Sequence, residues 1–237
     1  QTENSRQWFY IYTAQQRLES YYRLPVLAYE RPVHSVGIVI NGVKGGVTYM
    51  REPISGPNFA FTGYVYGGRE MSMGTFIHET AGHAFGLLGD EYSTSGFDPG
   101  QPFEIPDYEA TRLRNEQKKG WYLNLSLTSD PKSVYWAHLI GHPRYPYVGV
   151  LQGGYYYAFG VWRSESYSLM ENSTNFYFNT ICRELIVRRI MALTGEEYTF
   201  DKFLAKDSDK DRPNLSKSRS QQIKDQERRH QPPIIGE

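Results

Sequence analysis

Residues 75–92 read TFIHETAGHAFGLLGDEY, and this stretch decides how the rest of the chain is interpreted. Glu79 directly follows His78, His83 comes five residues after His78, and the acidic pair Asp90–Glu91 closes the stretch. Zinc hydrolases of the HExxH type use the same kinds of residue in the same order: a helix presents two histidine ligands, and the glutamate is the general base. The stretch therefore predicts a zinc-dependent hydrolytic site.

The spacing of the two histidines differs from that motif by one residue. In HExxH the histidines are about 40° apart around an α-helix, whereas a separation of five residues gives about 140°, too far to share one metal. A π-type turn, with i→i+5 hydrogen bonds, absorbs the extra residue and returns both rings to one face. Ala81 and Gly82 are small, and Gly82 weakens a regular helix by roughly 1 kcal/mol relative to alanine. We therefore predict a widened turn between Glu79 and His83.

A catalytic zinc ion has three protein ligands and keeps one position for water, so a third ligand is needed. Gly86 is expected to end the helix, because glycine is favoured just past a helix C-terminus. The chain can then turn back towards the metal, and Asp90 is the preferred third ligand. Glu91 and Glu184 remain alternatives. Asp90 could instead cap a turn, with Glu91 holding the second ring nitrogen of a histidine.

The composition excludes some classes of partner. The 237 residues include 26 Lys and Arg and 26 Asp and Glu, a formal net charge of +0, which gives no reason to expect nucleic acid or an anionic membrane as a partner. No apolar run suggests a membrane span, and the sequence from Gln1 onwards is not expected to include a signal peptide. Cys182 is the one cysteine, so no disulfide can form within the chain, and its apolar helical surroundings predict a buried side chain.

Outward from the central stretch, hydrophobic periodicity predicts a mixed α+β domain. The expected strands are 35–41, 45–50 and 59–65, and the expected helices are 5–22, 71–85, 107–119, 129–139 and 178–193. The segment 144–157, rich in Tyr, Pro and Gly, is expected to be irregular and to form the wall of a substrate pocket. Either of the first two strands could be a plain sheet strand or an edge strand that pairs with an extended substrate.

Two further segments concern the metal site. Met170 lies in a polar turn downstream of the histidines, and in this order it resembles the Met-turn of metzincins, in which a thioether lies beneath the metal. His138 and His142 are four residues apart and could mimic a metal pair. Gly141 and Pro143 break the helix around them, so metal binding there is disfavoured.

On these residues the chain resembles the IgA-peptidase-type zinc metallopeptidases, in the HExxxH form of gut Bacteroides-like members. The resemblance extends over residues 36–207. It is carried by HETAGHAFG at 78–86, DEY at 90–92, GVWR at 160–163, SLM at 168–170, FN at 178–179, RE at 183–184, and VIN at 39–41 followed by GG at 45–46. Family members generally carry an additional N-terminal β-rich domain, which is expected to be absent here, and this departure leaves open how substrate is bound.

The resemblance implies a zincin/metzincin-like metallopeptidase fold with a mixed sheet, an active-site helix and a C-terminal helix after a Met-turn. Residues 1–207 would be the catalytic domain of a metalloendopeptidase, and 208–237 are expected to be a polar flexible tail. Zn²⁺ would be held by His78, His83 and Asp90, with Glu79 as the general base. The zinc would polarise the scissile carbonyl and lower the pKa of bound water.

The same resemblance implies a protein or peptide substrate, with host glycoproteins among the candidates, and an extracellular or cell-surface location. Cleavage of immunoglobulin A belongs to particular members and is not implied. Two other functions use the same residues: a catalytically inactive module that binds a protein or glycan, and a zinc hydrolase of non-peptide bonds. The intact set of His78, Glu79 and His83 argues against the inactive module, because a drifting site is expected to lose its glutamate first.

Overall fold

The computed structural model describes residues 34–40, 46–50, 58–63, 69–94 and 102–208. The chain divides into two compact units, with the boundary between Phe85 and Gly86. Both contain strands and helices, so the predicted α+β class is confirmed. The expected helix at 5–22 and all but the first residue of the expected tail at 208–237 lie outside the described residues.

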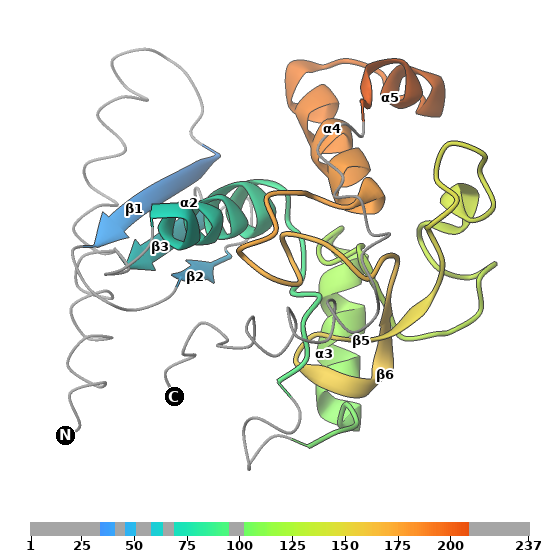
Figure 1. Cartoon of the computed structure of the whole chain (residues 1–237), viewed down its shortest axis with the longest axis horizontal. Helices are drawn as coiled ribbons and strands as arrows, with labels where there is room; N and C mark the ends of the chain where they lie inside the picture. The colour runs from blue at the N-terminus through green and yellow to red at the C-terminus, as the bar shows by residue number, and fades with distance from the viewer. Residues whose placement is uncertain (1–33, 41–45, 51–57, 64–68, 95–101, 209–237) are drawn as a thin grey trace. The chain divides into compact units, whose positions relative to one another are not determined.

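The first unit contains a three-stranded mixed sheet (Figure 1). Its strands are β1 (Ser35–Ile40), β2 (Gly46–Tyr49) and β3 (Asn58–Gly63), in the order β1-β3-β2. β1 is parallel to β3, and β2 is antiparallel to it. The three strands predicted at 35–41, 45–50 and 59–65 are therefore confirmed to within two residues, and β2 lies at one edge of the described sheet.

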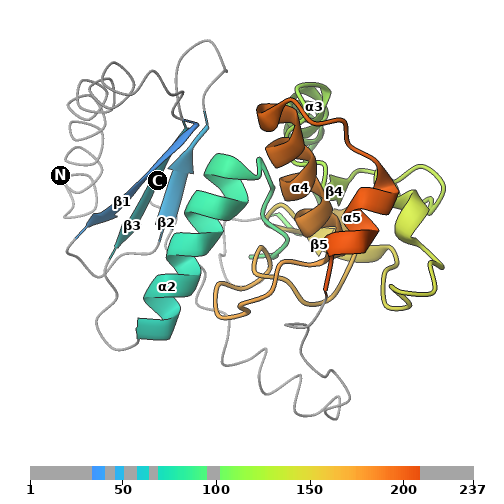
Figure 2. The same ribbon diagram turned by 90° about the horizontal axis from the view of Figure 1, so that it is seen from above.

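One continuous helical segment packs on this sheet (Figure 2). It begins as the α-helix α2 (Arg69–Ile77) and continues as the π-helix η2 (His78–Phe85), which contacts all three strands. The close approach needs a glycine in β1: a Cβ atom at Gly37 would lie 2.6 Å from Thr80 Cγ2. The Asn58 amide donates to the carbonyl of Ala84 at 2.8 Å, which ties β3 to the end of the helix.

The second unit contains an antiparallel sheet formed by β4 (Leu125–Ser126), β5 (Leu151–Gly154) and β6 (Tyr157–Arg163), in the order β4-β6-β5. The helix α3 (Asp107–Lys118) packs on it through the buried side chain of Leu113. The prediction that 144–157 is wholly irregular was wrong. The short strand β5 is concealed in the sequence because Gly153 and Gly154, both with positive φ, interrupt its alternation.

The main core of the second unit lies under the helices α4 (Thr180–Thr194) and α5 (Phe200–Lys206). Its buried residues are Leu88, Val134, Trp136, Leu139, Tyr145, Val148, Met170, Ile181, Cys182, Leu185 and Phe203. The predicted helix at 178–193 is confirmed as α4, which begins after the capping side chain of Asn179 and ends at Gly195 in a left-handed conformation with φ 73°. The lone Cys182 is fully buried, as predicted.

The predicted helix at 129–139 was wrong. Only η3 (Ala137–Leu139) forms, as a single 3₁₀ turn. The Asp130 carboxylate accepts the backbone N–H of Lys132 at 3.1 Å and the hydroxyl of Ser133, which favours a turn over a continuing helix. Within the described parts of the chain, no helix combines the length and the hydropathy that crossing a bilayer requires.

Candidate metal centre

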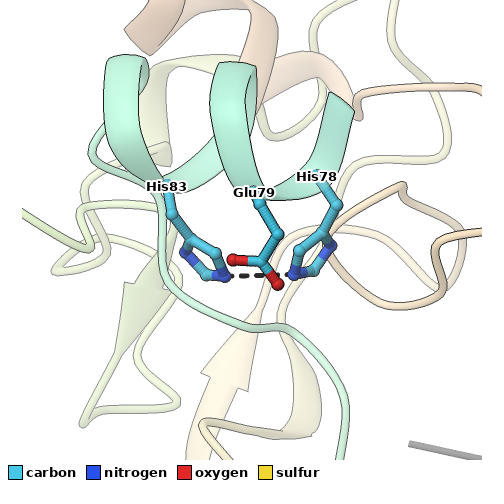
Figure 3. Close-up of side chains that lie close together, drawn as sticks. All are labelled: His78, Glu79 and His83. Atoms are coloured by element: carbon cyan, nitrogen blue, oxygen red, sulfur yellow. Dashed lines mark hydrogen bonds between the residues drawn. The ribbon is translucent and has the colours of Figure 1, made fainter. Parts of the chain in front are cut away.

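The π-helix η2 brings the two histidines of the central stretch together. The Nε2 atoms of His78 and His83 lie 3.0 Å apart, and their rings meet edge to face with centroids 4.7 Å apart. Figure 3 shows both rings leaving the helix on the same side. The predicted widened turn between Glu79 and His83 is therefore confirmed, because an i→i+5 turn places residues five apart on one face.

The two nitrogens fit a zinc ion. At the usual Zn–N distance of about 2.05 Å, two tetrahedral ligands are about 3.3 Å apart, and the observed separation is 3.0 Å. A shift of a few tenths of an ångström would accommodate the ion. Without a metal, one ring donates its Nε2 proton to the other, so an ion would replace a proton shared at the same point. The donors are imidazoles, which zinc favours.

The Glu79 side chain leaves the helix on the same side as the two rings (Figure 3). Ligand atoms of His78, Glu79 and His83 all lie within 4.8 Å of one another, and in the described ranges no other group of three His, Cys, Asp or Glu residues meets this criterion. His78 and Glu79 are each only 3% exposed, and His83 is 9% exposed. Electrostatic interactions are strong at such a site, because little water screens them.

Two residues of β2 contact Glu79, and the sequence interpretation missed both. The Thr48 hydroxyl lies 2.6 Å from Glu79 Oε2 and 3.0 Å from the Glu79 carbonyl oxygen. At Gly46 a Cβ atom would lie 2.6 Å from Glu79 Cδ. A signal was present, since Gly46 and Thr48 alternate in a predicted strand and so share one face. Sequence alone did not say that this face meets the glutamate.

Asp90, the predicted third ligand, belongs to the second unit. It is 6% exposed, and its Oδ2 accepts the hydroxyl of Tyr156 at 2.5 Å. Its carbonyl accepts the backbone N–H of Tyr155 at 2.8 Å. Burial, followed by the charge of Asp90, raises the pKa of Tyr156 well above its ordinary value. The phenol therefore keeps its proton and donates a hydrogen bond to Asp90, and hydrogen bonds of this kind orient ligating carboxylates.

The segment that leads to Asp90 leaves the helix abruptly. The helix ends at Phe85, as the prediction for Gly86 required, but the left-handed residue is Leu87, with φ 57°. The side chain of Asn124 then holds the backbone of Gly89 by two bonds: its Oδ1 accepts the N–H at 2.8 Å, and its Nδ2 donates to the carbonyl at 2.9 Å. This pairing fixes the residue immediately before Asp90.

Glu91 is fully buried and is bonded to amides and a thiol. Asn179 Nδ2 donates to both of its carboxylate oxygens at 2.9 and 2.8 Å, Asn124 donates to Oε1 at 3.0 Å, and the Cys182 Sγ lies 3.6 Å from Oε1. Burial raises the pKa of Glu91, although the bonds from Asn124 and Asn179 oppose the shift. A carboxylate so enclosed is a structural anchor, which disfavours the alternative of Glu91 as a metal ligand.

Glu184, the other alternative ligand, is also occupied. Its Oε2 lies 2.7 Å from His138 Nε2, and its Oε1 accepts bonds from Arg188 and Tyr198. Burial alone would raise the pKa of Glu184, but its bonds to His138, Tyr198 and Arg188 lower it. The bond to Glu184 also gives the His138 ring a carboxylate partner. The Nδ1 atom of His142 instead accepts the backbone N–H of Arg144 at 3.3 Å, a hydrogen bond within the same turn.

Met170 lies in a tight polar turn, as predicted. The Ser168 hydroxyl accepts the Met170 N–H at 3.1 Å, and the Ser168 carbonyl accepts the Asn172 N–H at 3.0 Å. The Met170 side chain is fully buried in the main core of the second unit, and its carbonyl accepts the N–H of Glu91 at 2.9 Å. The turn therefore holds the segment next to Asp90 through the backbone.

Comparison with known proteins adds nothing to this geometry. No protein-family model matches the chain, and no curated protein matches it. The family resemblance therefore stays a prediction that rests on the motifs, and the functional argument depends on the cluster of His78, Glu79 and His83.

Proposed function

We propose that the chain is a zinc-dependent endopeptidase. The single observation that carries the proposal is the π-helical turn, which places the Nε2 atoms of His78 and His83 3.0 Å apart, with a Glu79 carboxylate oxygen within 4.8 Å of both. A π-turn is rare and is frequent at functional sites. Two buried imidazoles and one buried carboxylate are the donor set that a hydrolytic zinc centre needs.

His78 and His83 would hold Zn²⁺ through their Nε2 atoms. Asp90 is proposed as the third ligand from its place in the sequence, four residues beyond Gly86, and its bond from Tyr156 supports an ionised, oriented carboxylate. When bound, zinc supplies Lewis acidity, which makes water a better nucleophile and the scissile carbonyl a better electrophile.

The chain's own part in the reaction is proton transfer by Glu79. Its carboxylate accepts the proton of the attacking water and delivers that proton to the amine that leaves, as a general base and then a general acid. Burial of Glu79 excludes competing solvent, and the hydroxyl of Thr48 holds one of its oxygens. The group that moves the proton is thus fixed beside the two histidines.

The finer fold assignment, a zincin/metzincin-like domain of the IgA-peptidase type, is part of the same proposal. It is supported by the order of parts: a mixed sheet, a helix with both histidines, a buried methionine turn and the helix α4. β2 is an edge strand of the described sheet and bonds to Glu79, so it is the proposed site of main-chain pairing with an extended peptide. An extracellular or cell-surface location and a host glycoprotein substrate follow only from the family.

The test combines metal analysis of the purified protein with cleavage of a mixed peptide library, with and without a chelator. We expect about one zinc per chain and chelator-sensitive cleavage. Glu79→Gln should keep zinc and lose cleavage, whereas His83→Ala should lose zinc. Zinc without peptide cleavage would instead favour a hydrolase of non-peptide bonds. Absence of zinc would favour a binding module, and unchanged turnover in Glu79→Gln would overturn the role of the glutamate.

A further inference from the structure

We propose that Gly46 and Thr48 of β2 form a socket that positions the Glu79 carboxylate for proton transfer. The inference rests on the proposed function and extends it to Thr48, which none of the motifs above includes, and to a contact of Gly46 that the motifs do not indicate. Thr48 is a positioning residue: it acts through Glu79. Gly46, Thr48 and Glu79 all belong to the first unit, in which the helix packs on the three-stranded sheet.

The socket has a polar side and an empty side. Gly46 and Thr48 are two residues apart in a strand, so they face the same way, towards η2. The Thr48 hydroxyl binds Glu79 Oε2 at 2.6 Å. Beside it, the missing side chain of Gly46 leaves the space that Glu79 occupies, since a Cβ there would lie 2.6 Å from Glu79 Cδ. Thr48 thus holds one carboxylate oxygen of Glu79, and Gly46 leaves room for the Glu79 side chain.

The same hydroxyl also lies 3.0 Å from the carbonyl oxygen of Glu79. The hydroxyl has one proton, which is shared in a three-centre hydrogen bond between the carboxylate and the backbone carbonyl of Glu79. Because His78 is the preceding residue in the same helix, fixing the carboxylate against that backbone fixes it relative to the first imidazole. A glutamate has three side-chain torsions, and a bond to a charged group at this distance restricts them strongly. Such positioning is what proton transfer in an active site requires.

A neighbouring threonine separates this role from ordinary sheet packing. Thr62 of β3 pairs with Gly46 across the two strands and is 1% exposed. Its hydroxyl has no hydrogen-bond partner within the described residues. The described strands thus include a part-buried hydroxyl that bonds to the glutamate, that of Thr48, and a buried hydroxyl without such a bond, that of Thr62. Thr62→Val is the matched control for Thr48→Val, with the same change of atoms one strand away.

The experiment measures kcat and KM separately on one cleaved peptide, with zinc content and thermal unfolding for each variant. Thr48→Val should lower kcat by roughly 10- to 100-fold, the loss of a hydrogen bond to a charged group. KM should stay within about twofold, because the lost bond does not touch substrate. Zinc content should not change. Thr48→Ser, which keeps the hydroxyl, should recover most of kcat, and Thr62→Val should behave as wild type.

A double-mutant cycle isolates the contact. In a Glu79→Gln background, Thr48→Val should cause no further loss of the residual activity, because the group it positions is gone. In zinc-free protein, Thr48→Val should lower Tm by about 2–4 °C more than Thr62→Val does. The same excess should be absent in a Glu79→Ala background. This second measurement needs neither metal nor turnover.

The outcomes distinguish the socket from the proposed function. An active, zinc-containing wild type with unchanged kcat in Thr48→Val would overturn the socket alone, as would a Thr48→Ser variant as slow as Thr48→Val. A wild type that contains no zinc and cuts no peptide would remove the proposed function and with it the catalytic role of the socket. In that case the unfolding cycle still reports whether Thr48 and Glu79 are coupled.

Discussion

The alanine substitution of Gly46 is the sharpest single perturbation of the candidate site. The added Cβ would lie 2.6 Å from Glu79 Cδ, whereas carbon atoms in contact are about 3.5 Å apart. The difference requires the glutamate side chain to move by about 1 Å. The added Cβ lies closer still to the Cγ methylene of Glu79, and the displaced carboxylate strains its bond from Thr48, so the movement should also cost some stability. Its consequence should appear in the reaction, where a misplacement of about 1 Å lowers the rate by roughly 100-fold.

The assay measures kcat on a peptide whose cleavage site has been mapped, and the zinc content of each variant is measured alongside. Gly46→Ala should keep its zinc, because neither imidazole is displaced directly, and should lose kcat. Gly149→Ala is a matched control, since a Cβ at Gly149 has no neighbour within 4 Å and its φ is not in the left-handed region. That variant should retain wild-type turnover.

Three results would refute the reasoning. A Gly46→Ala protein with the kcat of the wild type would show that the turnover rate does not depend on the position of the Glu79 carboxylate. Equal losses in Gly46→Ala and Gly149→Ala would show a general effect of replacing glycine. Loss of zinc together with kcat in Gly46→Ala would show that the strand supports the histidines and not the glutamate alone.

Three further predictions concern stability. Asn179→Ala should cost about 2–4 kcal/mol in denaturant unfolding, because it removes the cap of α4 and leaves the buried Glu91 without two of its bonds; a cost below about 0.5 kcal/mol would refute the anchor. Asp207→Asn should lower Tm at pH 7, since the Arg183 guanidinium binds both oxygens of Asp207. Burial would raise the pKa of Asp207, but Arg183 and Tyr145 hold it below its ordinary value, so this stabilisation is present above about pH 4 and is lost as the pH falls through the lowered pKa. A Tm difference that grows as the pH falls below about 4 would contradict it. Zinc at about 100 times its Kd should stabilise the wild type by about 2.7 kcal/mol, and His83→Ala should abolish the effect; an equal shift in both proteins would place the metal elsewhere.

Local chemistry made the core of the site predictable from sequence. His78 and His83 are five residues apart, and only a widened turn brings such a pair to one face, so the spacing itself specified the π-helix. The strands at 35–41 and 45–50 were also predictable from local sequence, because their residue types fit a pleated surface. Asn179 and Gly195 mark the ends of α4 in the same way.

The parts that sequence did not predict depend on contacts between distant segments. Thr48 reaches Glu79 from 31 residues away, and nothing in its neighbours indicates that partner. The strand β5 was obscured by glycines whose conformation suits a tight hairpin. At 129–139 the sequence has a helical pattern, but most of the segment does not form a helix. The side chains of Asp130 and Ser133 make local hydrogen bonds that compete with the helix.

The burial of Glu91 has a consequence for biosynthesis. Its carboxylate is satisfied by Asn124, 33 residues downstream, and by Asn179, 88 residues downstream. A ribosome-bound chain that ends before Asn179 therefore lacks the amide that donates to both oxygens of Glu91, and long-range contacts of this kind form late. We expect the segment around Asp90 to stay open to proteases during synthesis and to close only after α4 emerges. Pulse proteolysis of stalled nascent chains of increasing length would show where protection begins.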